Sequence, residues 1–556
     1  MKLRSMLFTS LASAALSLPA AAQGVQVWYE GPKEPLLAAG AEFGSSVAGL
    51  PGGQRNLLIA GPNYGADAGR VVLASIDAFV SQYSFTGDPG WRFGEVVAAG
   101  GFVNGDGFRD FAISAPRKDH FAVPFPLDEA GSVYVYSGQE PYAMLHELKG
   151  HATGDRFGEA VVLDWDVDGD SRADILVGAP YADLPGGLTD AGYVELYSGA
   201  TGALIVRHEG EEAGDLFGFA VTYLGDMNGD HRSEYAIGVP GDDFFTVLPP
   251  AFVPEGGSVR VFNGATHALL YTAQGAAGHE LGTSLEGVGD IDGDGLRELI
   301  AGAPGASGDM GQARHYEGLS GTLVRTYSGP GATTGERFGI WVSDGGDHDK
   351  DGHPELAIGG LFGGSAQQHG FVRIFRGSDG TAWKTVYLAP GSKGGYAFAG
   401  GADLNDDGWA DLLVGRPAAD IDGTNSGYAE VWGFLHYQDD LGFKKGGGTL
   451  EVYGSELATG KQADLLLTGA GTNNQAWLLA GFSTAYAPFH GGTLVPSLSP
   501  SILLPLATDN FGKLFLPGIP GGSGTGGIVH AYMQFIVRDP FGVVTLSNAV
   551  DLEFLP

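Results

Sequence analysis

Hydrophobic positions along most of the chain follow the period of a β-strand. They alternate with polar residues in segments such as Gly131–Tyr136 and Gly257–Phe262, or form short apolar runs such as Leu299–Ala303. Alternation is typical of strands buried on one face, and short apolar runs between turns are typical of strands buried on both faces. Apolar residues at helical spacing are nearly absent. The pattern therefore predicts an all-β protein with many short strands.

The strands recur in units that open with Phe-Gly or a near equivalent. Each unit continues with an acidic loop, an apolar strand that ends in a Gly-Ala-Pro-like turn, an alternating strand and a fourth short strand such as Ala143–Leu148. The units open at Phe43, Phe93, Phe157, Phe217, Leu281, Phe338 and, less clearly, near Tyr396, at spacings of 50 to 64 residues. Four short strands per repeat describe a propeller blade. The sequence therefore predicts a seven-bladed β-propeller over residues 23–437.

The last unit lacks a clear fourth strand of its own. Its third strand is Tyr428–Trp432, whereas Val25–Glu30, near the start of the chain, has the pattern of a fourth strand. We expect this N-terminal strand to complete the last blade and to cover an edge that would otherwise be free to pair with other chains. The segment Phe434–Tyr437 is the alternative source of that strand.

One acidic loop, Asp290 to Glu298, shows the chemistry of the repeat most clearly. Carboxylates stand at its positions 1, 3, 5 and 9, and a glycine at position 6 permits a sharp turn. Alternating acids place their oxygens on one side of a tight loop, which suits Ca²⁺ because this ion prefers six to eight oxygen ligands. Position 12 is Ala301 rather than the glutamate of an EF-hand. The pattern therefore predicts a calcium loop that leads into a strand.

Four further loops fit the same frame. Their ligands at positions 1, 3, 5 and 9 are Asp166, Asp168, Asp170 and Asp174; Asp226, Asn228, Asp230 and Glu234; Asp347, Asp349, Asp351 and Glu355; and Asp403, Asn405, Asp407 and Asp411. One such loop could be a solvated turn, but five in one register favour repeated metal binding. A sixth, degenerate copy has Asn104, Asp106 and Asp110, with Phe102 in place of the first ligand, so we expect a weak or empty site there. His348 and His353 are expected to be solvated rather than to bind metal through their rings.

The Phe-Gly, acidic loop and Gly-Ala-Pro pattern resembles the FG-GAP repeat of the integrin α-chain N-terminal β-propeller, over about 400 of the 556 residues. The loops of that family bind Ca²⁺. The resemblance therefore implies ligands at the positions given above, together with the position-7 carbonyl groups of Arg172, Arg232, Leu296, His353 and Trp409. The first unit has Gly52–Arg55 where the acids would be, so no ion is expected there. Stalk domains, an inserted adhesion domain and an Arg-Gly-Asp tripeptide are not apparent. The resemblance implies the architecture and calcium, and it suggests adhesion.

The N-terminal composition indicates export. Residues 1–22 are organised as a signal peptide, with Lys2 and Arg4, a mainly apolar middle and the cleavage site Ala20–Ala22; a buried N-terminal helix is the alternative. No later stretch has the ~20 apolar residues of a membrane span. The chain contains no cysteine, so disulfides cannot brace it outside the cytoplasm, and bound metal is the substitute.

Residues 438–556 lose the repeat. They open with a candidate linker, Lys444–Gly448, and continue with alternating or apolar runs such as His530–Val537. We expect a small C-terminal β-sandwich-like domain. Such a domain either anchors or sorts the protein, or it is a packed module without a role of its own.

The sequence contains no recognisable catalytic motif. It lacks a cysteine nucleophile, a Gly-x-Ser-x-Gly elbow and a His-Glu-x-x-His helix. The net charge of −35 argues against nucleic acid and anionic membranes as partners. We therefore expect a monomeric, extracellular or cell-surface scaffold that binds an unidentified protein or glycan. The alternatives are a secreted hydrolase acting on polysaccharides or esters, with insertions such as His120–Glu129 and Asp242–Glu255 shaping its site, and a structural envelope or matrix protein.

Overall fold

The computed structural model of the protein describes residues 27–30, 40–50, 56–75, 80–121, 125–247, 250–330, 334–348, 351–361, 370–387, 397–404, 410–417, 427–433 and 438–440, and nine strands between residues 449 and 554. The chain forms two compact units, one running from Val27 to Val431 apart from residues 407–409, and one that includes Trp432–Pro556. In the part of the chain that the structure describes, no helix is long and apolar enough to cross a membrane. The N-terminal segment that is predicted to be a signal peptide lies outside the described residues.

The first unit contains six antiparallel sheets that each use four strands of one repeat. These are β2 (Ser46–Leu50), β3 (Asn56–Gly61), β4 (Arg70–Ser75) and β5 (Val80–Thr86); β6 (Val97–Ala99), β7 (Phe111–Ala115), β8 (Ser132–Tyr136) and β9 (Met144–Lys149); β10 (Ala160–Leu163), β11 (Ile175–Ala179), β12 (Tyr193–Tyr197) and β13 (Leu204–Glu209); β14 (Ala220–Gly225), β15 (Glu234–Val239), β18 (Ser258–Phe262) and β19 (Leu269–Gln274); β20 (Leu285–Val288), β21 (Glu298–Ala303), β22 (Gln312–Glu317) and β23 (Leu323–Ser328); and β24 (Trp341–Gly346), β25 (Glu355–Gly360), β26 (Phe371–Phe375) and β27 (Ala382–Tyr387). Two helical turns, α2 (Tyr64–Asp67) and α3 (Ala306–Asp309), connect the second and third strands of their sheets.

A further four-stranded sheet is composite. It joins β28 (Phe398–Ala402), β29 (Asp411–Arg416) and β30 (Tyr428–Gly433) to β1 (Val27–Glu30). The β1 strand pairs antiparallel with β30, with Val27 opposite Val431 and Glu30 opposite Tyr428. The expected use of the N-terminal strand is thus confirmed, and the alternative segment 434–437 lies outside the described residues. The sequence predicted seven blades, but the structure shows six blades that are each formed by one repeat. The composite sheet is formed by two distant parts of the chain.

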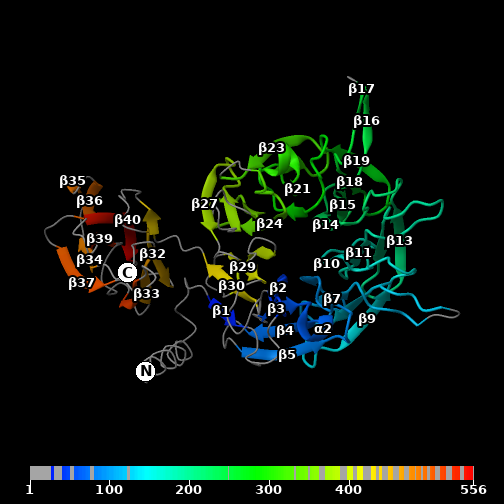
Figure 1. The fold of residues 1–556 in the computed structure, drawn as a ribbon, viewed down its shortest axis with the longest axis horizontal. Helices are drawn as coiled ribbons and strands as arrows, with labels where there is room; N and C mark the ends of the chain where they lie inside the picture. The colour runs from blue at the N-terminus through cyan, green and yellow to red at the C-terminus, as the bar shows by residue number, and fades with distance from the viewer. Residues whose placement is uncertain are drawn as a thin grey trace. The chain divides into compact units, whose positions relative to one another are not determined.

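The first strands of these sheets contact one another in a cycle. The β2 strand contacts β6, β6 contacts β10, β10 contacts β14, β14 contacts β20, β20 contacts β24, β24 contacts β28, and β28 contacts β2 (Figure 1). Because the last inner strand contacts the first, the sheets close into a ring. The β-propeller architecture that the repeat predicted is therefore confirmed.

Paired glycines explain why neighbouring blades fit closely. A Cβ on Gly178, from a Gly-Ala-Pro turn, would lie 2.0 Å from the carbonyl oxygen of Gly218 in the next Phe-Gly. Gly238 and Gly302 have the same relation to Gly282 and Gly339, at 2.1 and 1.9 Å. Gly415 would likewise meet the Gly44 oxygen at 2.0 Å, so the composite sheet contacts the first blade as ordinary neighbours do. Only glycine permits this backbone approach.

Aromatic side chains fill the space between the blades. Phe43, Phe157, Phe217 and Phe338, all from Phe-Gly pairs, are 0 to 2% exposed. Aromatic residues of the third strands, such as Tyr134, Tyr197 and Phe262, are also buried. They therefore belong to the core and do not form an exposed surface for stacking against sugars. This packing accounts for the Phe of each Phe-Gly pair.

An inserted hairpin differs from this buried pattern. It is formed by β16 (Phe244–Val247) and β17 (Pro250–Val253) and projects from the fourth blade (Figure 1). Phe245 lies opposite Phe252, their ring centroids are 5.1 Å apart, and their exposed fractions are 75% and 51%. The hairpin therefore presents an aromatic pair to solvent.

The second unit is also all-β. Its strands are β31 (Gln438–Asp440), β32 (Thr449–Gly454), β33 (Gln462–Thr468), β34 (Gln475–Gly481), β35 (Thr484–Phe489), β36 (Gly492–Pro496), β37 (Ser501–Ala507), β38 (Leu514–Pro520), β39 (Val529–Arg538) and β40 (Val544–Phe554). They form a five-stranded sheet in the order β31-β40-β39-β34-β37, a three-stranded sheet β32-β33-β38 and the pair β35-β36. The β-sandwich-like arrangement and the boundary at residue 438 stay predictions.

Candidate metal centres

The acidic loops connect the first strand of a sheet to its second. Loop 166–174 lies between β10 and β11, loop 226–234 between β14 and β15, loop 290–298 between β20 and β21, loop 347–355 between β24 and β25, and loop 403–411 between β28 and β29. The degenerate loop 102–110 lies between β6 and β7. Because all six leave the same end of an inner strand, they lie on the same face of the ring.

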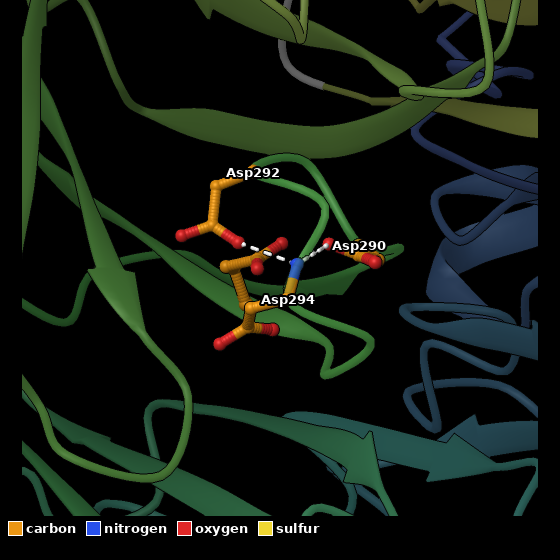
Figure 2. A group of neighbouring side chains, drawn as sticks. Asp290, Asp292 and Asp294 are labelled. Carbon is orange, nitrogen blue, oxygen red and sulfur yellow. Dashed lines mark hydrogen bonds between the residues drawn. The ribbon is translucent and has the colours of Figure 1, made fainter.

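Loop 290–298 brings its four predicted carboxylates together. One oxygen from each of Asp290, Asp292, Asp294 and Glu298 lies within 4.8 Å of the others. The amide of Asp294 donates to Asp290 and to Asp292, both at 3.1 Å (Figure 2). Asp290 also accepts the amides of Gly293 and Gly295, at 2.6 and 2.8 Å. Backbone amides thus turn the carboxylates toward one point, and the resulting set of hard oxygens suits Ca²⁺.

Loop 166–174 forms a second group from Asp166, Asp168 and Asp174. Asp166 accepts the amides of Gly169 and Ser171, at 2.6 and 2.7 Å, in the pattern of the other loop. Asp170, the predicted position-5 ligand, is not part of this group; it accepts the Arg172 amide at 2.8 Å, as Asp294 accepts the Leu296 amide. The loop therefore assembles three of its four predicted carboxylates.

The remaining loops are described in part. In loop 226–234 the side-chain Nδ2 of Asn228 donates to Glu234 at 2.5 Å, and Asp226 accepts the backbone amides of Gly229 and His231, at 2.7 and 2.8 Å. In loop 347–355 the described predicted ligands are Asp347, Asp351, His353 and Glu355, and in loop 403–411 they are Asp403 and Asp411. The predicted ligands Asp349, Asn405, Asp407 and Trp409 lie outside the described residues.

The position-9 acid has a role that the sequence reading missed. In every loop it accepts a hydrogen bond from the backbone amide of the position-2 residue. The donor–acceptor pairs, at 2.5 to 3.0 Å, are Val103 to Asp110, Val167 to Asp174, Met227 to Glu234, Ile291 to Glu298, His348 to Glu355 and Leu404 to Asp411. All six acids are 0 to 2% exposed. A buried carboxylate thus closes each loop through hydrogen bonds of its own. The fixed spacing of seven residues is the signal that could have revealed it.

Burial raises the pKa of four of these acids, Asp110, Asp174, Glu234 and Glu298, and most clearly that of Asp174 and Glu298. The pKa of Glu298 is raised to about 8, mainly by burial and in addition by the charges of Asp292, Asp290 and Asp294, while the hydrogen bond from Ile291 lowers it. Burial likewise raises the pKa of Asp174 to about 7, with Asp168 adding to the effect. A divalent cation would compensate this concentrated negative charge, so the residues present fit a bound Ca²⁺.

Side chains at position 7 connect neighbouring loops, which sequence reasoning also missed. The Arg232 guanidinium donates to the carbonyl of Val167 at 3.1 Å and lies against Gly169 in the preceding loop. Arg172 lies against Gly105 in the same way, and His353 lies 3.5 Å from a Cβ built on Gly293. These contacts involve the side chains and not the carbonyl groups. The predicted use of the position-7 carbonyl groups as ligands therefore stays a prediction.

The expectation of a solvated His348 is wrong. This residue is 0% exposed, and its ring centroid lies 5.8 Å from that of Trp383. It occupies position 2, where the other loops place Val103, Val167, Met227, Ile291 and Leu404, all buried. Position 2 points inward because its amide bonds the buried acid at position 9. His353 is half-buried rather than solvated.

The degenerate loop keeps the shape without the first acid. Asp110 accepts the amides of Val103 and Asn104, at 2.7 and 3.1 Å. The side-chain Nδ2 of Asn104 donates to Asp106 at 2.9 Å, so these two side chains bond each other. Phe102 instead contacts the Arg109 guanidinium, 5.1 Å from the ring centroid. An uncharged residue at position 1 therefore leaves fewer oxygens for an ion.

Four segments of the chain match the family model described as FG-GAP repeat. They are residues 93–136, 157–197, 282–316 and 394–432. The chain contains FG-GAP repeats. Three matched segments include an acidic loop with a complete ligand pattern, and the first includes the degenerate loop, so the FG-GAP match and the loop geometry coincide.

The chain is similar to integrin α chains over part of its length. Integrin alpha-5 of Xenopus laevis is 30% identical over 228 residues, which are 37% of this chain and 20% of that protein. Integrin alpha-IIb of Homo sapiens is 33% identical over 183 residues, 30% of this chain and 16% of that protein. The matched region therefore spans a fifth or less of these relatives. The solved Dos1 propeller aligns with a TM-score of 0.39 and 9% identity over 70% of this chain and 77% of that chain, a likeness too low to carry an argument.

Proposed function

We propose that this protein is an exported, calcium-binding β-propeller that serves as a cell-surface or extracellular scaffold for adhesion or ligand binding. The observation that best supports the proposal is the carboxylate group of Asp290, Asp292, Asp294 and Glu298, held in a loop that recurs around a ring with FG-GAP repeats. The similar proteins carry the name integrin, so the role proposed is non-enzymatic binding of a protein or glycan.

Calcium is proposed to occupy the five complete loops. Each loop supplies oxygens from positions 1, 3, 5 and 9 and the position-7 carbonyl, a number and kind of ligand that Ca²⁺ accepts. The degenerate loop is proposed to bind weakly or not at all, because Asn104 and Asp106 already bond each other. The ion would supply positive charge at each loop, and the chain's own residues would hold and orient it.

Ring closure and domain organisation belong to the same proposal. The composite sheet of β28, β29, β30 and β1 acts as the closing seventh blade of the propeller, and its antiparallel β1–β30 pairing supports this. Residues 1–22 are proposed to be a signal peptide, residues 23–437 the propeller and residues 438–556 a separate β-sandwich-like domain. A variant lacking Val25–Glu30 should then melt at a lower temperature and aggregate through the exposed β30 edge.

Calorimetric titration of the EDTA-treated protein with CaCl₂ tests the metal proposal. About five sites are expected, in the range of extracellular calcium modules, ~10⁻⁴–10⁻³ M. The Asp292→Ala variant should lose one site, while Asp106→Ala, in the degenerate loop, should lose none. Titration without any binding heat or any change in melting temperature would refute calcium binding.

A binding assay tests the scaffold proposal separately. The full chain is immobilised and exposed to a panel of extracellular-matrix proteins and to a glycan array, in calcium and in EDTA. We expect at least one ligand whose binding requires calcium. Calcium-loaded protein that retains no member of either panel would count against the scaffold role and leave the metal proposal standing.

A further inference from the structure

Two insertions of the ring carry its most exposed large hydrophobic side chains. Among the residues that the structure describes, these are Phe121, Phe125 and Phe245, which are 94, 75 and 75% exposed. The first two belong to insertion 121–127 between β7 and β8, and the third to the β16–β17 hairpin between β15 and β18. Residues 121–127 and 244–254 contain no charged side chain. Single exposed hydrophobic residues are ordinary, whereas contiguous apolar segments in water indicate interaction sites.

The β16–β17 hairpin has one pair of residues that packs on its blade and one pair that does not. Phe244 lies opposite Val253, which is 9% exposed. A Cβ built on Gly256 would lie 2.8 Å from both of these side chains, so they pack together at the base of the hairpin. The next pair, Phe245 opposite Phe252, lies on the other face, because successive residues of a strand alternate. The fold therefore uses the first pair and leaves the second to solvent.

The connection between the second and third strands is held at both ends in three blades. In each case the amide of the acidic residue at its end donates to an aspartate at its start. The donor–acceptor pairs, at 2.6 to 3.0 Å, are Glu129 to Asp119, Asp190 to Asp183 and Glu255 to Asp243. The residues between these ends differ in number and in kind. A rigid base that carries a variable loop is the usual arrangement of a binding surface.

These three connections lie on the face of the ring opposite the acidic loops. The acidic loops join the first strand of a sheet to the second, and these connections join the second to the third. Because neighbouring strands are antiparallel, the two kinds of connection lie at opposite ends of the sheet. The three blades are consecutive, since β6 contacts β10 and β10 contacts β14. The exposed aromatic residues thus share one face, away from the candidate calcium sites.

Acidic residues flank each connection at its base. Lys118, next to the first of them in the chain, is already paired with Glu147 at 2.6 Å, and Arg156 is paired with Glu129 at 3.0 Å. Arg117 offsets one further acid, so the surface keeps a surplus of negative charge. The acids that make no ion pair within the part of the chain that the structure describes are Asp119, Asp128, Asp183, Asp190, Asp243 and Glu255.

We propose that these three connections form a docking surface for a basic amphipathic segment of a protein partner. Phe121, Phe125, Phe245 and Phe252 would contact the apolar side chains of that segment, and the flanking acids would pair with its Lys and Arg residues. Aromatic residues supply much of the binding energy at protein interfaces, and their faces also attract cations. The inference rests on the proposed scaffold function and specifies the chemistry of its partner.

Charge distinguishes this partner from two other occupants of an apolar surface. A second copy of the chain would bring the same acids and the same net charge of −35, so repulsion opposes self-association. An anionic membrane would be repelled in the same way. A basic partner is instead attracted before contact, and the aromatic residues then hold it.

Fluorescence anisotropy with a labelled amphipathic peptide of leucine and lysine tests the surface, using the calcium-loaded full chain. We expect Phe245→Ser combined with Phe252→Ser to weaken binding about tenfold, because exposed aromatic anchors are lost. The matched control is Leu204→Ser on β13, whose side chain is 50% exposed against 51% for Phe252 but lies outside the connections. This control should bind as the original protein does. A peptide of leucine and glutamate should not bind.

The flanking acids give a second, independent readout. Asp128 and Glu255 are exposed, and the bonds of their backbone groups do not need the side-chain charge. Asp128→Asn and Glu255→Gln should each weaken binding about twofold, as exposed ion pairs do, and should make it less sensitive to salt. The aromatic double variant should keep the salt dependence of the original protein. A merely structural role of the connections would not separate these two effects.

Equal peptide affinity of the original protein and the aromatic double variant, both folded by melting temperature, would overturn the inference. Absence of peptide binding by the original protein overturns it equally. Binding of phosphatidylcholine vesicles that requires Phe245, without peptide binding, would assign the surface to a lipid bilayer and reject the proposal. A dimer in sedimentation that the double variant loses would assign it to a second copy and reject the proposal as well.

The panel assay keeps this inference apart from the scaffold proposal. If a panel ligand binds but its affinity ignores Phe245 and Phe252, the scaffold role stands and only this surface fails. If no panel ligand is found but the peptide binds through these residues, the surface stands and the scaffold role fails.

Discussion

Loops 290–298 and 102–110 occupy the same place in their blades but differ at one decisive position. Both have a glycine at position 6 with nearly the same φ, 88° at Gly295 and 89° at Gly107. In both, the acid at position 9 accepts the amide of position 2 at 2.7 Å. The first loop begins with Asp290 and the second with Phe102. The turn therefore forms without the first acid, and that acid adds the carboxylate cluster rather than the shape.

The largest expected effect comes from removing the position-9 acid of the degenerate loop. Asp110→Ala leaves the amides of Val103, Asn104 and Gly138 without their buried acceptor. The free energy of unfolding should fall by about 3 kcal/mol, since each buried unsatisfied group costs about 1–3 kcal/mol. Denaturant unfolding should show the same loss in calcium and in EDTA. A loss confined to calcium would mean that position 9 serves metal binding alone.

Removing the first acid of the complete loop should lower the free energy of unfolding by less than Asp110→Ala does. Most of this loss should require calcium. Asp290→Asn removes a charge from the cluster and keeps one of the two oxygens that accept the amides of Gly293 and Gly295. The variant should lose about 1.4 kcal/mol of stabilisation when free calcium is tenfold above the dissociation constant. Melting curves with and without CaCl₂ measure this difference. In EDTA the variant should melt at a slightly lower temperature than the original protein, because one of the two amides loses its acceptor. An unchanged response to calcium would contradict the assignment.

Glu286, a half-buried acid outside both loops, distinguishes the effect of calcium on stability from the effect of pH. Burial raises the pKa of Glu286 to about 8, with Asp344 adding and Arg297 opposing. Because the folded protein holds this proton more tightly than the unfolded chain, the contribution to stability is full below the unfolded pKa and is lost as pH rises through about 8. Glu286→Gln should reduce the fall in melting temperature between pH 6 and pH 9 by a few degrees. The same reduction in calcium and in EDTA would show independence from the loops.

The smallest expected effect is a gain in calcium binding and in stability. Phe102→Asp restores the first acid of the degenerate loop, beside Asn104, Asp106 and Asp110. Calcium titration should reveal one additional weak site and about 1 kcal/mol of extra stabilisation at millimolar calcium. Phe102→Ala is the control, since it removes the contact with Arg109 without adding a ligand. If Phe102→Asp binds no further ion, the first acid alone does not distinguish the two loops.

Much of this fold was predictable because its signals are local. The Phe-Gly pair, the Gly-Ala-Pro turn and the four short strands lie within one repeat, and repetition made them recognisable as a β-propeller. The N-terminal strand was also predictable, because the last unit left an edge that needed a partner. The grouping of Asp290, Asp292, Asp294 and Glu298 followed from spacing in a single loop.

The sequence by itself determined the repeat, the strands and the acidic register, because each depends on residues that are near neighbours in the chain. Tertiary structure decided what those residues do beyond their own repeat. It buried His348, placed Arg232 against the preceding loop, and paired Arg337 with Glu280 of the preceding blade. The physical reason is distance along the chain. Contacts between blades join residues many positions apart, and only the closed ring fixes which of them meet.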